Sequence, residues 1–115
     1  MITLKTLPQA TEQEVFDQVA SHLLKQGEKS ANRNGGCRYR YEDKKCAAGC
    51  LIGDDEYYSS LEAEPWSILS SRKKVPCEHA DLIGRLQTIH DAKDAENWEL
   101  ELKRLALVRN LNWNL

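Results

Sequence analysis

Four cysteines and three histidines are the side chains of this chain that could bind a metal or support nucleophilic chemistry. Thiolate and imidazole ligands suit tetrahedral zinc, and the candidate ligands are Cys37, Cys46, Cys50, Cys77 and His79. Their spacings are irregular and include no Cys-x-x-Cys pair, and cysteine is also a common core residue. We therefore expect small core side chains here, with a structural zinc ion as the lesser alternative.

Thiol catalysis is the second chemistry that these residue types could support. A cysteine nucleophile needs an adjacent base, but no known catalytic motif surrounds any of the cysteines or histidines. His79 is expected at a helix start and His90 at a helix end, where the helix dipole favours a cation. We expect no catalytic residues and a protein without chemistry of its own.

The segment 37–52 is the predicted structural centre. From Cys37 to Tyr41, cysteine and tyrosine alternate with arginine, which is the period of a half-buried strand. Residues 46–52 are expected to form a partner strand or a short helix. The small residues around Gly49 permit close approach of another backbone, so a small β-hairpin within 37–52 is predicted.

Helices are predicted on both sides of this hairpin. Thr11 to Glu14 matches a capping box that starts a helix, and Gly27 is suited to end it. Apolar residues at helical spacing predict three more helices, at about 66–69, at about 78–90 and after a cap at Asp94. The alternating tail 111–115 is expected to lie extended against the hairpin.

Length and composition indicate one soluble α+β domain that is mostly helical. The chain has 115 residues, of which 41% are hydrophobic and 30% charged. Its net charge of -2 makes a dedicated nucleic-acid binder an unlikely class. The first residues lack the apolar segment of a signal peptide, and no run could span a bilayer. We expect a cytoplasmic protein without membrane contact.

Two surfaces are candidates for binding. The first is an acidic stretch with tyrosines that suits a basic protein surface, and it consists of Asp54, Asp55, Glu56, Tyr57 and Tyr58. An ordinary solvated loop is the alternative interpretation. The second is the arginine face of the hairpin, Arg38 and Arg40, which suits a small anionic ligand or nucleic acid.

The last predicted helix has more apolar residues than one core face requires. Leu100, Leu107 and Leu111 lie off the stripe that Trp98 and Leu102 begin. A helix that is apolar around its circumference is sandwiched between layers or covered by a partner subunit. A homodimer is therefore one expectation.

The cysteine segment also resembles a known family. The blocks Cys37-x-Tyr39-Arg40 and Lys45-Cys46-Ala47-x-Gly49-Cys50-Leu51-Ile52 are similar to those of small uncharacterised proteins from bacteriophages, prophages and other mobile elements of proteobacteria. The resemblance covers essentially the whole chain and implies no activity. It implies a non-catalytic accessory protein that binds and modulates a host protein or complex, with inhibition of host defence as one form of that role.

Overall fold

The structure, a computed structural model, describes residues 1–115 and contains four α-helices and one hairpin. The helices are α1 (Glu12–Gln26), α2 (Trp66–Ser71), α3 (Ala80–Ala92) and α4 (Trp98–Val108). Strands β1 (Arg40–Tyr41) and β2 (Lys44–Lys45) form the hairpin. Four short 3-10 turns complete the chain: η1 (Leu7–Gln9), η2 (Gly49–Leu51), η3 (Ser59–Ala63) and η4 (Ala95–Asn97). The prediction of a mostly helical α+β domain is confirmed.

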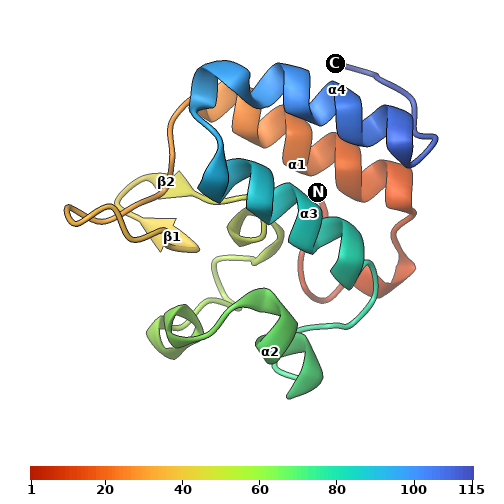
Figure 1. Cartoon of the computed structure of the whole chain (residues 1–115). Helices are drawn as coiled ribbons and strands as arrows, with labels where there is room; N and C mark the ends of the chain where they lie inside the picture. Colours follow the sequence, from red (N-terminus) through yellow and green to blue (C-terminus); the bar gives the residue numbers. More distant parts are fainter.

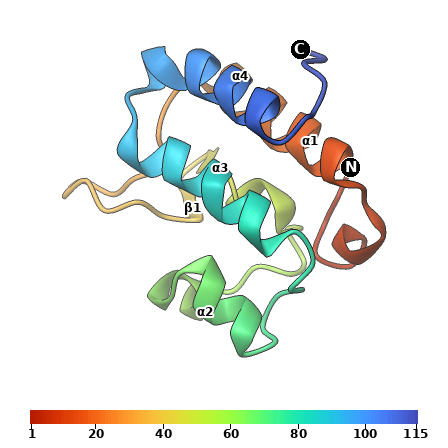
Figure 2. The ribbon, with the colours of Figure 1, turned by 45° about the vertical axis from the view of Figure 1, so that its right-hand side comes forward.

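The helices are arranged around α3. Helices α1 and α4 lie side by side and run in opposite directions, and α3 contacts both of them (Figure 1). Helix α2 packs against α3 on the side away from α4, and Figure 2 shows this order from a second direction. None of the helices combines the length and the apolar composition needed to cross a lipid bilayer.

Helix α1 begins and ends where its sequence predicts. The Thr11 hydroxyl accepts the Glu14 backbone N–H at 3.1 Å, and the Glu14 carboxylate accepts the Thr11 backbone N–H at 2.8 Å. Gly27 adopts a left-handed conformation with φ of 67°, and its N–H donates to the Leu23 carbonyl. Both ends are determined by contacts within a few residues, which explains why sequence patterns locate them.

The hairpin is shorter than the alternation predicts. Arg40 pairs with Lys45 and Tyr41 with Lys44, whereas Cys37 forms an isolated bridge with Ala31. Residues 46–52 do not form a second strand; they contain the 3-10 turn η2, so the short-helix alternative is correct. The first half of the predicted strand therefore pairs with the loop that precedes it.

Gly49 lies where another backbone approaches most closely. A Cβ atom at this position would overlap the carbonyl oxygen of Tyr39. The same carbonyl accepts the Cys46 backbone N–H at 3.2 Å, which holds the two segments together. The close approach expected from the run of small residues is thus present, and Gly49 is required for the packing of η2 against the hairpin.

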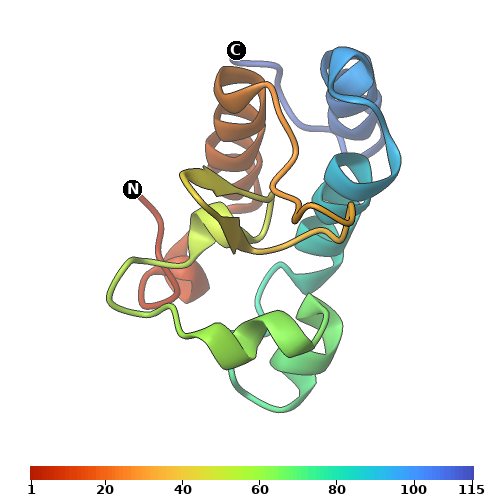
Figure 3. The same ribbon diagram turned by 90° about the vertical axis from the view of Figure 1, so that its left-hand side faces the viewer.

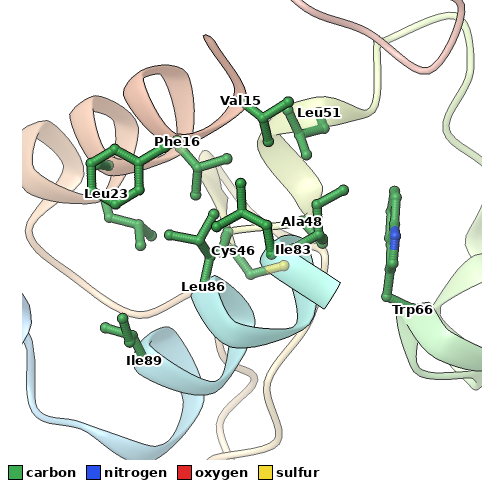
Figure 4. Packing of buried hydrophobic residues seen from close by; sticks show 14 of the residues in the cluster. Val15, Phe16, Leu23, Cys46, Ala48, Leu51, Trp66, Ile83, Leu86 and Ile89 are labelled. Atoms are coloured by element: carbon green, nitrogen blue, oxygen red, sulfur yellow. The ribbon is translucent and has the colours of Figure 1, made fainter. Parts of the chain in front are cut away.

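The core lies between α1, α3 and residues 46–52, as Figure 4 shows for ten labelled side chains. The structure buries apolar residues of every helix and of residues 46–52, among them Phe16, Val19, Leu23, Leu51, Ile52, Trp66, Leu82, Leu86, Trp98 and Leu102. Leu105 is only half-buried. The apolar stripes therefore identify the core-facing sides of α1, α3 and α4, whereas on α2 Trp66 is buried and Ile68 is exposed.

Two predictions about the C-terminal region are wrong. The tail lies along α1 rather than against the hairpin, because Trp113 packs edge-on against Phe16 and the Asn112 backbone N–H donates to the Gln13 side chain at 2.8 Å. Asp94 precedes η4, and its side chain makes no cap hydrogen bond. The tail lies beside Gln13, Phe16 and Asp17 of α1, a position that the alternation of 111–115 does not specify.

Candidate functional site

The predicted arginine face is organised by an acidic residue from outside the hairpin, Glu62. Its nearly buried carboxylate accepts the backbone N–H groups of Tyr39 and Arg40 at 2.8 and 3.0 Å and the Tyr57 hydroxyl at 2.7 Å. The Arg38 Nε lies 3.5 Å from the same carboxylate. No sequence pattern identifies this role, because Glu62 reaches the hairpin from more than twenty residues away.

Arg40 makes three contacts inside the protein, although its Nε has no hydrogen-bond partner. Its guanidinium pairs with Asp54 at 2.8 Å, donates to the Ile52 carbonyl at 2.7 Å and lies over the Tyr57 ring at 4.9 Å from the centroid. The Arg40 side chain is only 18% exposed. Since Arg38 and Arg40 each have a carboxylate within 3.5 Å, the hairpin offers no free pair of cations to an anionic ligand.

In the acidic stretch 54–58, some side chains bind other parts of the chain and others are exposed to solvent. The Glu56 carboxylate accepts the backbone N–H groups of Leu4 and Lys5 at 2.9 and 3.0 Å, so it anchors the N-terminal segment. Asp54, Asp55 and Tyr58 are exposed, and Asp54 also pairs with Arg40. The exposed part of the stretch is therefore two carboxylates and one tyrosine, and their role in binding stays a prediction.

The structure does not bring the predicted zinc ligands together. No three of the residues Cys37, Cys46, Cys50, Cys77 and His79 place their ligand atoms close to one another. The Cys46 sulfur accepts the Gly49 backbone N–H, and the His79 Nε2 lies 2.7 Å from the Ala10 carbonyl. These side chains have separate structural contacts, so the set does not form a tetrahedral site.

Burial keeps the inner thiols protonated. It raises the pKa of Cys50 to about 12 and raises the pKa of Cys46 as well. Partial burial, with the nearby Asp91 carboxylate, raises the pKa of Cys37 to about 11. Because the thiolate is the reactive form, none of these three cysteines is activated as a nucleophile.

His90 is a buried hydrogen-bonding residue and not the helix-end cation expected from the sequence. Its Nε2 accepts the Ser30 backbone N–H at 3.0 Å, so this nitrogen carries no proton. The proton of the neutral ring is therefore on Nδ1, which donates to the Asp91 carboxylate at 2.7 Å. The ring also stacks on Trp98. His90 thus connects the loop before the hairpin to α3 and α4.

The position of the His90 ring proton decides whether the one cluster of potential metal-binding side chains could hold an ion. Ligand atoms of Cys37, His90 and Asp91 lie within 4.8 Å of one another. A metal on His90 Nδ1 would require the ring proton to move to Nε2, where it would face the Ser30 N–H. The donor set of this cluster therefore does not fit a metal ion.

The outer face of α4 is the surface that has no intramolecular role. Leu107 and Val108 are each 82% exposed, and Leu100 is 52% exposed. These three residues share the side of the helix opposite to Leu102 and Ala106, which are buried. Figure 3 shows α4 at the edge of the molecule beside α1, so no other element covers this face.

Comparison with known proteins identifies no relative of this chain. No protein-family model matches the chain, and neither a curated protein nor a solved structure does. The functional argument therefore depends on the chain's own residues. Among these, the outer face of α4 is a surface whose composition internal packing does not explain.

Proposed function

We propose that this chain is a non-catalytic accessory protein that binds and modulates a host protein or complex in the host cytoplasm. The observation that carries the proposal is the exposure of Leu100, Leu107 and Val108 on one side of α4. Apolar side chains gathered at the centre of a surface patch are typical of protein interfaces. The resemblance to proteins of phages and mobile elements supplies the biological setting for such a role.

The charges on α4 specify the chemistry of the partner. Arg104 lies one helical turn from both Leu100 and Val108, and its side chain is 65% exposed although it pairs with Glu101 at 3.0 Å. Lys103 lies next to it and pairs with Glu99 at 3.3 Å. A partner with an apolar groove for Leu100 and Leu107 and an acidic side chain for Arg104 is complementary to this face. The binding mode is a helix in a groove.

The test is capture of host proteins by matched variants. Wild-type protein, Leu107→Glu and a control, Ile68→Glu, are immobilised and exposed to the same host lysate, and captured proteins are quantified by mass spectrometry. Ile68 is an exposed apolar residue on α2, so the control places the same charge on a different surface. We expect a prey that the wild type and the control retain and Leu107→Glu loses at least tenfold.

Two results would overturn the proposal. If Leu107→Glu captures the same proteins as the wild type, α4 is not the docking face. If light scattering shows a wild-type dimer that Leu107→Glu converts to a monomer, a second copy of the chain occupies this face instead. That second result would support the homodimer expected from the sequence.

A further inference from the structure

A polar hollow of about 330 Å³ lies between three segments of the chain. It is bordered by the strand-like residues 37–39, by the turn that leads into α2, and by Gln87 and Asp91 of α3. The volume is at the lower end of the range for small-ligand pockets, about 300–1,000 Å³. It suits a single amino acid and not a dinucleotide.

Unpaired polar atoms gather at this hollow. Four buried side-chain nitrogen or oxygen atoms in the molecule have no hydrogen-bond partner, and three of them belong to residues that line it. They are the Trp66 Nε1, the Glu64 Oε2 and the Arg38 Nε. Trp66 is only 4% exposed, so its N–H is not accessible to bulk water. Buried polar groups in native proteins almost always have partners, so this concentration indicates a site.

The remaining contacts of these residues show which atoms are free. The other Glu64 oxygen pairs with Arg72, and the Glu64 backbone carbonyl accepts the Tyr39 hydroxyl at 2.8 Å. The Tyr39 ring packs edge-on against Trp66 at 6.2 Å between centroids. Glu64 and Trp66 are therefore positioned by neighbours on their other atoms. What they leave unpaired is one carboxylate oxygen and one indole N–H.

The unpaired atoms suit a ligand that has a hydrogen-bond acceptor at one end and a cationic group at the other. The Trp66 indole N–H is an unused donor, which suits a carboxylate or another acceptor, whereas the Arg38 Nε already lies 3.5 Å from the Glu62 carboxylate. Glu64 has an unused carboxylate oxygen, which suits an ammonium group. A purely anionic ligand is disfavoured because the carboxylates of Glu62, Glu64 and Asp91 outnumber the single lining arginine.

We propose that this hollow binds a small zwitterion of the α-amino acid class. The ligand carboxylate accepts from the Trp66 indole N–H, and the ligand ammonium group donates to Glu64. Cys37 lies exposed at the rim with a protonated thiol, so it contributes a weak donor and no covalent step. The proposal is independent of α4 and stands or fails separately from the protein-binding role.

The test is calorimetric titration with the common L-amino acids, one at a time and at millimolar concentration. For any amino acid that binds, the amine without the carboxylate and the acid without the ammonium group are titrated next. The variants are Trp66→Phe, which removes only the indole N–H and part of the ring, and Glu64→Gln, which removes the charge. Glu78→Gln is the control, because Glu78 is exposed and does not line the hollow.

We expect binding of at least one amino acid, weakening of about tenfold or more in both hollow variants, and no change in the control. Both truncated analogues should bind at least tenfold more weakly than the intact zwitterion. Circular dichroism of each variant checks its fold, and Glu64→Gln keeps the test decisive if Trp66→Phe fails to fold. If no amino acid binds, or if binding survives Glu64→Gln unchanged, the hollow holds only solvent and the proposal is wrong.

Discussion

The hairpin and α4 use their side chains in opposite ways. At the hairpin, the charged side chain of Arg40 contacts a carboxylate, a carbonyl and an aromatic ring of the same chain. On α4, the apolar side chains of Leu107 and Val108 contact almost nothing. The region with the most distinctive sequence is thus an internal support, and the plainer helix presents the exposed surface. Distinctive residues indicate where the architecture is demanding, and this need not be where a partner binds.

A large loss of stability should follow from adding one methyl group to the hairpin support. Gly49→Ala places its Cβ on the Tyr39 carbonyl oxygen, and the backbone there cannot move without losing the Cys46 hydrogen bond. We expect the free energy of unfolding to fall by about 3 kcal/mol, at the upper end of the range for overpacking. Chemical denaturation measures it.

The matched control is Gly84→Ala on α3. A Cβ at Gly84 meets no atom within 4 Å, and the residue lies in an exposed helix interior. Alanine should therefore raise the stability by about 0.5–1 kcal/mol. If both alanine variants shift the denaturation midpoint in the same direction, η2 does not pack on the hairpin as described.

The next effect concerns the carboxylate that holds the hairpin. Glu62→Ala leaves the backbone N–H groups of Tyr39 and Arg40 without their acceptor, and we expect a loss of about 1–3 kcal/mol in unfolding free energy. The comparison variant is Glu99→Ala on α4, where an exposed ion pair with Lys103 should contribute less than about 0.5 kcal/mol. Equal losses in urea denaturation would remove the contrast between the two regions.

A pH dependence should follow from Asp91. Burial favours its neutral form, but hydrogen bonds from His90, Gln87 and Cys37 outweigh burial and hold the pKa of Asp91 below its ordinary value. A lowered folded-state pKa means that the carboxylate stabilises the fold above the unfolded pKa of about 3.9 and that this contribution is lost as the pH falls through the folded value. Stability measured by denaturation should thus decrease on acidification.

The variant that isolates this effect is Asp91→Asn. The wild type should be the more stable protein at about pH 6, and the stability difference between the two should shrink by about pH 3, since the wild-type carboxyl is then becoming neutral. A difference that stays constant between these pH values would show that Asp91 is not the group responsible.

The smallest effect on stability is expected on the outer face of α4. Leu107→Glu should change the free energy of unfolding by less than about 0.5 kcal/mol, because this side chain makes few contacts to lose. Leu102→Ala, on the buried side of the same helix, should cost about 2–5 kcal/mol. Thermal denaturation of the pair shows whether α4 has one structural face and one free face.

Sequence patterns predicted the parts of this fold that depend on neighbouring residues. The capping box at Thr11, the left-handed Gly27 and the apolar stripes of the helices are all present. The close approach at Gly49 was also predictable, because a run of small side chains has that single packing consequence. The excess of apolar residues on the last helix predicted a helix that is sandwiched between layers or covered by a partner subunit. The structure leaves Leu100 and Leu107 exposed, and cover by a partner stays a prediction.

Long-range partners were not predictable. Nothing in the sequence links Glu62 to the hairpin backbone, His90 to the Ser30 N–H or the C-terminal tail to α1. For the same reason, the cysteines suggested a zinc site that the structure does not assemble. Each of these contacts depends on which distant segment of the chain the fold places beside the side chain.

The sequence by itself therefore determined the helices, their core-facing sides and the demand for a glycine at position 49, because helix caps and apolar periodicity act over a few residues. Only the tertiary structure decided which polar groups find partners. It gave both ring nitrogens of His90 a hydrogen-bond partner and left Trp66 Nε1 and Glu64 Oε2 unpaired beside one hollow. The physical reason is that a polar group pairs with whatever donor or acceptor the folded chain places within about 3 Å.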